Sequence, residues 1–466
     1  MKANSNLTNN SRRHFIKQAG LISIGFIALS RCTDAKAEIT SENKMMDIGL
    51  QRDPLGYLDL PKGFSYKIIS RAGEPMEDGF LLPGRPDGMG AFKLDHQRLI
   101  IIRNHELSAQ SPRLGPFGES NKLLTSFDSS LFYDAGSGHY PSLGGTTTLI
   151  YNEGTQEVEQ QFLSLVGTNR NCAGGVTPWG TWLTCEEDVS SKHGPIEKDH
   201  GYVFEVPAHS SPQVIQPKPI KAMGRFNHEA VCVDPNTGIV YQTEDRSNGL
   251  IYRYLPHVKE QLLKGGRLQA LAIIDQPKLD TRNWKKRKIK LNKPMEVRWV
   301  DLDKIDSSQD NLRLIGAGNG AAVFARGEGM WFGNNEIYFA CTNGGTKKNG
   351  QVFRYVPSPY EGTEKELKVP GRLELFAETR NTNLLSMCDN LTVAPWGDVI
   401  LCEDNSRCNY IRGIRPNGKI YTFACNRSSS SEFVGAVFSP SGKTLFVNIQ
   451  ENGETLAITG PWENLA

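Results

Sequence analysis

Five residues share one position of a degenerate repeat, and their side chains are of types that bind metal ions. The repeat is clearest in residues 176–187 (VTPWGTWLTCEE) and 393–404 (VAPWGDVILCED). In both, an apolar residue precedes a Pro-Trp-Gly turn, a short and largely apolar strand follows, and the segment ends on Cys and two acidic residues. A candidate ligand lies four residues before each segment, Cys172 in the first and Asp389 in the second.

The same pattern recurs, less faithfully, in four further segments. Asp87, Glu229 and Glu328 hold the leading position in three of them, and the last, residues 438–450, has no acid there. A single acid would more often cap a turn or form an ion pair elsewhere, because charged side chains are mostly exposed. Recurrence at one phase of the repeat instead favours a shared site made of Asp87, Cys172, Glu229, Glu328 and Asp389.

These six units also predict the fold. Gly (46) and Pro (25) are frequent, which indicates many turns between short strands. Units that cannot bury their own faces stack radially. We therefore expect an all-β fold, a six-bladed β-propeller with long inter-blade insertions, since the units are unevenly spaced. The innermost strands of a propeller line a central channel, so the five leading residues should form a ring there.

The ligand types narrow the choice of metal. Carboxylates that converge in a channel repel one another, and cations offset that repulsion. Oxygen ligands suit hard cations such as Ca²⁺, whereas a thiolate beside them indicates a transition metal such as iron or zinc. A zinc site built on histidine is poorly supported, because the chain has only nine histidines.

Most of the other cysteines are interpreted as structural. Four of them, Cys185, Cys232, Cys341 and Cys402, occupy strand-like positions where a small apolar residue packs well. A chain of this length does not need disulfides to hold its core together. Cys172 is the exception, because it stands at the position shared with the acids.

The N-terminus predicts export. Residues 11–17 (SRRHFIK) form a twin-arginine box, and the apolar stretch 19–29 is too short to span a bilayer. Ala35 and Ala37 supply the small residues of a cleavage site. We predict a Tat signal peptide over 1–37, a mature domain over 38–466, the Tat translocase as partner during export, and a periplasmic or secreted protein. No stable membrane anchor is expected, an uncleaved leader being the alternative.

The overall charge argues against nucleic acid as a partner. The chain has 53 basic and 51 acidic residues, a net charge of +2. Its one basic cluster, residues 285–290, lies on an irregular stretch and is interpreted as a solvated loop.

Several motifs together resemble the PhoX family of exported alkaline phosphatases. These are the twin-arginine leader, residues 171–180 (NCAGGVTPWG) with 185–187 (CEE), 224–229 (GRFNHE), 324–328 (FARGE) and 388–390 (CDN). The resemblance covers most of the mature chain. It implies that 38–466 is a propeller phosphatase domain with a calcium and iron (Ca²⁺ and Fe³⁺) cluster that hydrolyses phosphate monoesters.

The resemblance also assigns residues. It implies that Cys172, Glu187, Glu229, Glu328 and Asp389 are metal ligands, and that Arg326 holds the phosphate of the substrate ester and acts in catalysis. Arginine suits that task, because its planar fork matches two phosphate oxygens. The alternative for Arg326 is an ion pair with Glu328.

Two other functions remain open from the residues alone. A calcium-dependent propeller hydrolase acting on lactones or organophosphates would use the acids and leave Cys172 without a role. A non-catalytic metal-binding propeller would suit the uneven insertions. No Gly-x-Ser-x-Gly motif occurs, so a serine nucleophile of that kind is not indicated.

Overall fold

The computed structural model describes residues 44–465, so the predicted leader over 1–37 lies outside the described part of the chain. Short antiparallel strands dominate these residues, as the density of turn residues predicts. One α-helix, α2 (Leu312–Gly318), is present among them. The 3-10 helices are η1 (Glu119–Asn121), η2 (Leu124–Ser126), η3 (Ser129–Leu131), η4 (Gly136–Gly138), η5 (Lys221–Met223), η6 (Leu262–Lys264), η7 (Glu366–Lys368) and η8 (Trp462–Asn464).

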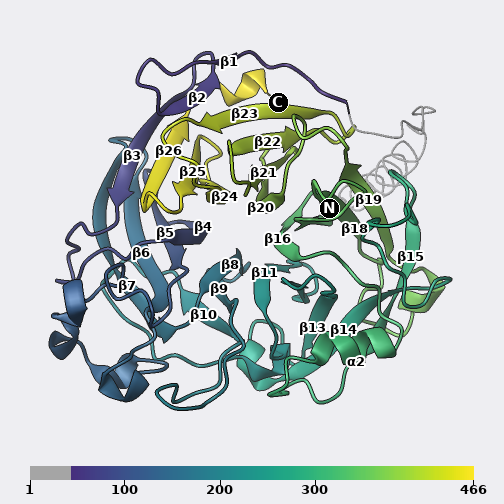
Figure 1. Cartoon of the computed structure of the whole chain (residues 1–466), viewed down its shortest axis with the longest axis horizontal. Coiled ribbons are helices and arrows are strands. Elements are labelled where there is room, and N and C mark those ends of the chain that lie inside the picture. The colour runs from purple at the N-terminus through teal and green to yellow at the C-terminus, as the bar shows by residue number, and fades with distance from the viewer. Residues whose placement is uncertain (1–43, 466) are drawn as a thin grey trace, which may run out of the picture. The chain divides into compact units, whose positions relative to one another are not determined.

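The strands form five sheets arranged in the manner of a propeller (Figure 1). The first sheet contains β4 (Pro86–Lys93), β5 (Arg98–His105), β6 (Gly144–Asn152) and β7 (Glu157–Thr168). The second contains β8 (Asn171–Val176), β9 (Thr181–Glu186) and β10 (Val203–Pro207).

The third sheet has nine strands. In spatial order they are β11 (His228–Val233), β12 (Val240–Glu244), β13 (Ile251–Pro256), β14 (Gly266–Ile273), β15 (Met295–Asp301), β19 (Arg372–Glu378), β18 (Gln351–Val356), β17 (Glu336–Cys341) and β16 (Gly327–Gly333).

The last two sheets contain both ends of the described chain. One contains β1 (Leu50–Gln51), β2 (Leu58–Pro61), β23 (Ile420–Asn426), β22 (Tyr410–Ile414), β21 (Val399–Glu403) and β20 (Cys388–Val393). The other contains β24 (Phe433–Phe438), β25 (Thr444–Ile449), β26 (Glu454–Thr459) and β3 (Ser65–Arg71). Because β3 pairs with β26, from Arg71 opposite Glu454 to Ser65 opposite Thr459, an early strand closes the sheet of the last repeat unit.

The prediction of six separate blades was wrong in its sheet count. The structure has four sheets and one nine-stranded sheet, and the units led by Glu229 and Glu328 share the latter. The physical reason is a short antiparallel pairing between β15 and β19, in which Met295 lies opposite Leu373 and Glu296 opposite Arg372. Hydrogen bonding therefore continues from one repeat unit into the next. The longest connection, residues 106–143, also joins two strands of the first sheet, β5 and β6, and does not connect one sheet to the next.

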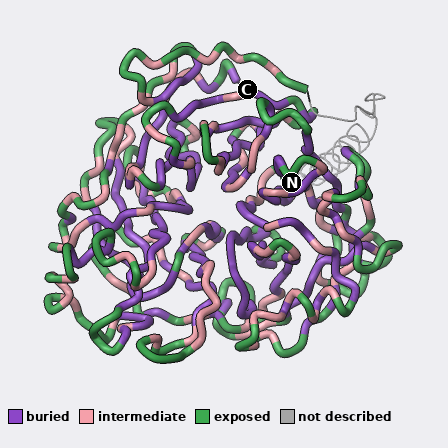
Figure 2. The backbone as a smooth tube through the Cα atoms, in the orientation of Figure 1, coloured by how far each residue is buried: buried purple, intermediate pink, exposed green. Residues whose placement is uncertain are grey.

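The six strands that begin the repeat units still contact one another in a ring. They are β4, β8, β11, β16, β20 and β24, and each is the strand of its unit nearest the centre (Figure 1). Buried backbone surrounds the centre, while most exposed segments lie at the rim (Figure 2). The ring therefore brings together residues that are hundreds of positions apart in the sequence.

The core lies between neighbouring sheets. Ile101 and Tyr151 of the first sheet pack with Val437 and Phe446 of the last. The predicted structural thiols are confirmed as buried, with Cys185, Cys232, Cys341 and Cys402 all inside hydrophobic clusters. Among residues 44–465, no helix has the length and apolar character needed to cross a membrane.

Candidate metal centre

A β-bulge places each leading residue toward the centre. In the second sheet Asn171 pairs with Glu186, and pairing resumes only at Gly174, which leaves Cys172 and Ala173 unpaired. Asp87, Glu229, Glu328 and Asp389 follow the first paired residue of their strands in the same way. A bulge bends the strand and re-aims the side chain it displaces. The repeat phase seen in the sequence is therefore the phase of a bulge.

The sixth unit has the bulge without the acid. Val434 is paired and pairing resumes at Val437, so Gly435 stands in the equivalent place. Its φ is 68°, and a Cβ on it would lie 2.3 Å from the carbonyl oxygen of Asp87. No larger residue fits there without movement of the backbone. Glu432, three residues earlier, supplies a carboxylate to the centre instead.

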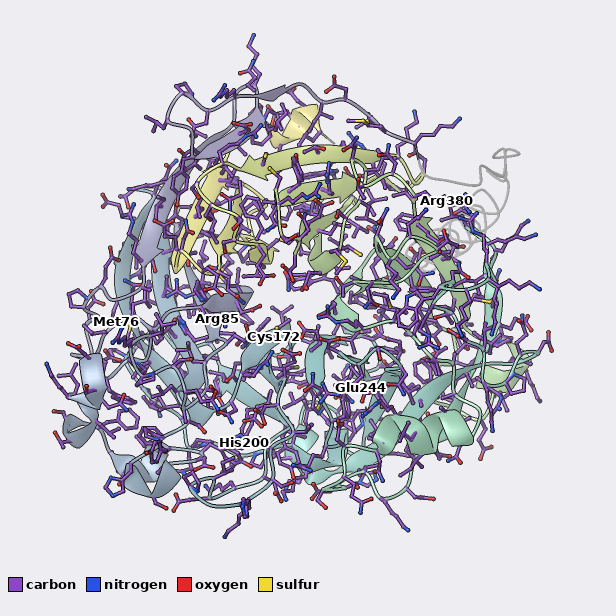
Figure 3. All side chains as sticks on the ribbon, in the orientation of Figure 1. Met76, Arg85, Cys172, His200, Glu244 and Arg380 are labelled. Carbon is purple, nitrogen blue, oxygen red and sulfur yellow. The ribbon has the colours of Figure 1, made fainter. Side chains whose placement is uncertain are left out.

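In several units the second strand ends on a pair of acidic residues, and the two members of each pair have different roles. Glu186, Glu244 and Glu403 are the last residues of β9, β12 and β21, and all three are fully buried. Each is bonded away from the centre, to His200 (2.6 Å), to the Tyr252 hydroxyl (2.7 Å) and to Arg412 Nε (2.9 Å) respectively. Cys172 borders the centre while His200 and Glu244 lie further out (Figure 3). The second acid of each pair, Glu187, Asp245 or Asp404, is left for the centre.

The ligand atoms fall into three connected groups, within each of which they lie no more than 4.8 Å apart. The groups are Cys172, Glu187 and Glu229; then Glu229, Glu328 and Asp389; then Asp389, Asp404 and Glu432. Glu229 and Asp389 are shared, so the three groups form one continuous array.

All five predicted ligands are thus brought together, whereas Asp404 and Glu432 were missed. Asp404 carried a signal, because it is the counterpart of Glu187 in the repeat. Glu432 carried none, since it lies outside the repeat position.

Burial and mutual repulsion disfavour the charged forms of these acids. Burial, reinforced by neighbouring carboxylates, raises the pKa of Glu187 to about 7 and that of Asp389 to about 8. The same causes raise the pKa values of Glu229, Glu328 and Glu432 well above their ordinary range. Bound cations are the general means of keeping such a cluster ionised.

Cys172 lies in the same environment. Burial raises the pKa of its thiol well above the ordinary value, and the charge of Asp87 adds to the effect. The thiol lies 3.7 Å from Asp87 Oδ2, which also accepts a hydrogen bond from Gln450 Nε2 at 2.6 Å. Asp87 was predicted to share the site, but it is outside the three ligand groups and instead contacts the thiol of Cys172. Gln450, which directly follows β25 of the last sheet, also donates to Glu106 at 3.1 Å.

One buried carboxylate oxygen indicates that the array fits cations. Glu229 Oε2 has neither a hydrogen-bond partner nor an ion-pair partner among the described residues, whereas Glu328 Oε1 lies beside Arg326. Buried polar atoms are almost always bonded, so the Glu229 oxygen is the observation that points to a ligand. Carboxylate oxygens throughout, with one sulfur at one end, form a donor set that hard cations and one softer cation would fill.

Arg326 is bound to carboxylates beside the array. Its Nε and Nη2 donate to the two oxygens of Asp245, each at 2.8 Å, and Nη2 lies 2.8 Å from Glu328 Oε1. The predicted ion pair with Glu328 is therefore present, although it is not aligned as a hydrogen bond. Burial lowers the pKa of the guanidinium, but the charges of Glu328 and Asp245 outweigh it and raise that pKa. The side chain is 32% exposed, so its two carboxylate partners do not enclose it.

Two further arginines occupy the repeat position of Arg326, two residues before a leading residue. Arg85, Arg170 and Arg326 have φ values of 44°, 46° and 50°, in the left-handed region that non-glycine residues rarely adopt. Arg170 forms ion pairs with Glu187 and, at 2.8 Å, with Glu106. Arg85 reaches the other oxygen of Glu106 at 3.1 Å. Aligning the repeat at this position would have revealed both.

A polar cavity of about 870 Å³ opens beside the third ligand group. Asp404 and Glu432 border it, and Arg407, Cys408 and Tyr410 line it further out. A ligand attached to the array therefore has space on this side.

Comparisons with known proteins agree with this architecture. A model of the family described as alkaline phosphatase PhoX matches residues 47–158 and 143–453. The solved structure of Pseudomonas fluorescens PhoX in complex with vanadate, a transition state analogue, is similar with a TM-score of 0.65 at 18% identity, over 90% of this chain and 98% of that one.

Other propellers are more distant. A gluconolactonase of Xanthomonas campestris has a TM-score of 0.39 at 12% identity, over 86% of this chain and 97% of that one. Virginiamycin B lyase of Staphylococcus aureus, with Quinupristin, has a TM-score of 0.38 at 10% identity, over 85% of this chain and 99% of that one. No curated protein sequence matches the chain. The family match spans most of the sequence, and the chain therefore belongs to the PhoX family of alkaline phosphatases.

Proposed function

We propose that this phosphatase hydrolyses phosphate monoesters at the array of carboxylates and one thiol. The observation that carries the proposal is the continuity of the three ligand groups, together with the unpartnered Oε2 of Glu229. We assign the metal ligands as Cys172, Glu187, Glu229, Glu328 and Asp389, and add Asp404 and Glu432.

The donor types support calcium and iron. The group with Cys172 suits Fe³⁺, because a thiolate beside carboxylates favours a transition metal. The two groups made of carboxylates alone suit Ca²⁺. Bound cations of this kind neutralise phosphate oxygens and activate an oxygen nucleophile.

Arg326 would hold the substrate phosphate. The Nε and Nη2 atoms of Arg326 donate hydrogen bonds to Asp245, whereas no described residue accepts a hydrogen bond from Nη1 of Arg326. That nitrogen can therefore donate to a phosphate oxygen while Asp245 fixes the plane of the guanidinium. Held in this way, Arg326 stabilises charge that develops on the phosphate in the transition state without having to reorganise. The cavity bordered by Asp404 and Glu432 offers the space for the alcohol part of the ester.

Hydrolysis of para-nitrophenyl phosphate, measured before and after chelation, tests this function. Metal analysis of protein purified without added metal belongs to the same experiment. We expect activity that chelation abolishes and that calcium with iron restores. Hydrolysis of lactones or phosphotriesters in place of monoesters would indicate the alternative hydrolase. Bound metal without any of these activities would indicate a non-catalytic propeller.

We further propose that the Tat translocase exports the protein and that the leader is removed after Ala37. The twin-arginine box and the small residues at 35 and 37 support this. Replacing Arg12 and Arg13 by Lys should leave uncleaved precursor in the cytoplasm. Normal export of that variant would overturn the assignment.

A further inference from the structure

Eight cysteines lie in the described part of the chain, and two of them, Cys408 and Cys425, are neighbours near the large cavity. Cys408 is half-buried and lines that cavity, and Cys425 is buried on β23. Neither belongs to the metal array. Burial raises the pKa of the Cys425 thiol to about 11, and the neighbouring Cys408 adds to that rise.

The backbone holds the two residues on neighbouring strands. Tyr410, the first residue of β22, lies directly opposite Cys425 in β23. One residue earlier, the carbonyl of Asn409 accepts a hydrogen bond from the amide of Asn426 at 3.0 Å. The pairing therefore continues as far as Asn409, and Cys408, one residue further, lies diagonally across from Cys425 on the neighbouring strand.

The loop that carries Cys408 is organised by side-chain amides. Asn405 Oδ1 accepts from the amide of Cys408 at 3.2 Å, and Asn405 Nδ2 donates to its carbonyl at 2.8 Å. The buried Asn409 donates to the carbonyl of Asn405 at 3.1 Å and to that of Ser430 at 3.0 Å. The loop is therefore already ordered in the folded chain, so bond formation needs only small local adjustment.

A cation stands beside both sulfurs. The guanidinium of Arg427 interacts electrostatically with Cys408 and Cys425, and Asp59 holds it through a hydrogen bond of 2.7 Å. Arg427 lowers the pKa of the Cys425 thiol and so partly offsets the effect of burial, and the thiolate is the reactive form in disulfide exchange. Since Cys408 lines the cavity, it is the thiol that a small oxidant can reach.

We propose that Cys408 and Cys425 form a disulfide in the mature protein, formed by exchange with a small-molecule disulfide such as oxidised glutathione. The Cys408 thiolate attacks one glutathione sulfur, forms a mixed disulfide and releases one glutathione thiolate. The Cys425 thiolate then attacks Cys408 Sγ and releases the second. In sum, two protein thiols and one glutathione disulfide give one protein disulfide and two glutathione thiols. The bond joins the loop after Asp404 to β23.

The test uses the purified full-length mature chain with its metals, equilibrated with oxidised or reduced glutathione. Remaining thiols are alkylated under denaturing conditions and counted by mass spectrometry. We expect oxidised protein to have a mass lower by two hydrogen atoms before alkylation, two fewer alkylated thiols afterwards, and a cross-linked peptide pair containing Cys408 and Cys425. The melting temperature of the oxidised form should be higher, because the bond closes a loop.

Three variants make the outcome decisive. Cys408→Ala and Cys425→Ala should each remove the cross-link and the rise in melting temperature, and Cys408→Ala keeps the test valid if the buried Cys425→Ala folds poorly. Cys402→Ala, a matched core cysteine, should leave both unchanged. The proposal is overturned if all thiols remain alkylated after oxidation, if glutathione stays attached to Cys408, or if Cys408 pairs with another cysteine. None of these readouts depends on phosphatase activity.

Discussion

Arg326 and Asp245 are joined by two parallel hydrogen bonds, both 2.8 Å long, although they come from opposite ends of the nine-stranded sheet. Asp245 directly follows β12, and Arg326 directly precedes β16. Strand β11 lies beside β16 at the centre, so the two ends of the nine-stranded sheet meet there. This pair fixes the orientation of the guanidinium at the array.

Replacing Arg326 tests whether it binds phosphate or only balances charge. Loss of a hydrogen-bond donor aimed at transition-state charge costs about 2.7–4 kcal/mol, on the order of a hundredfold or more in rate. We expect Arg326→Ala to lose that much turnover and to be inhibited less by inorganic phosphate. Arg326→Lys should recover little, because lysine lacks the two-pronged geometry. Near-normal activity of the Lys variant, or release of metal from the Ala variant, would leave charge balance as the role of Arg326.

Cys172→Ser should lower bound transition metal and activity together. The serine hydroxyl is a poor substitute for a thiolate ligand, and Cys172 is the one sulfur in the three groups of the described chain. Cys185→Ser is the control, since Cys185 is fully buried in a hydrophobic cluster one strand away. Cys185→Ser should lower the stability of the protein and leave its metal content unchanged. Equal loss of metal from both variants would mean that the thiols act through packing.

Substitutions of the adjacent residues Glu403 and Asp404 should have different effects, one on stability and the other on metal content. Glu403→Gln breaks a buried pair with Arg412 and should cost about 3–5 kcal/mol of stability while metal content is retained. Asp404→Asn removes a carboxylate from the third group and should lower metal content without lowering the melting temperature of the metal-free protein. Calorimetry and metal analysis of both variants give the comparison. Similar profiles would contradict the division of tasks.

Chelation should destabilise the protein more as the pH rises. Folding raises the pKa of Glu187 from 4.5 to about 7 and that of Asp389 from 3.8 to about 8, mainly through burial. Between the unfolded and folded values the folded chain binds more protons, so the metal-free protein loses stability with rising pH. Bound cations stabilise the ionised carboxylates and so remove this loss of stability. The difference in melting temperature between metal-loaded and chelated protein should grow from about pH 5 to about pH 8, and a constant difference would count against the array.

His200 should stabilise the fold most below neutral pH. It is fully buried, 2.6 Å from Glu186 and 3.3 Å from Asp134. Burial lowers its pKa, but the two carboxylates outweigh this and raise the pKa from 6.5 to about 10. Its stabilisation is therefore complete below 6.5 and is lost as the pH rises through 10.

His200→Gln should accordingly cost about 3–5 kcal/mol near pH 6 and much less near pH 10. Denaturant unfolding at both values measures this. The matched control is His105→Gln. Burial lowers the pKa of His105 well below its ordinary value of 6.5, so this ring stays neutral in the folded chain, and the cost of His105→Gln should not fall as the pH rises from about 6 to about 10. A cost for His200→Gln that is independent of pH would contradict a protonated His200.

The repeat by itself determined much of this protein. A common phase in five units predicted that Cys172, Glu229, Glu328 and Asp389 meet, and the bulge that follows the first paired residue explains why. Turn residues and apolar strands predicted an all-β propeller, since period and turn chemistry are local properties. The leader predicts export, which only experiment can test.

Only the tertiary structure decided which acid of each pair faces the centre. Glu403 and Asp404 are adjacent and both acidic, but successive residues point to opposite sides of a strand, and the register of β20 and β21 sets which side is inward. Gly435 leaves no room for a side chain at the bulge of the sixth unit, and Glu432 supplies a carboxylate from outside it. The pairing of β15 with β19 likewise arises between segments that are distant in sequence, where no local pattern specifies the contact.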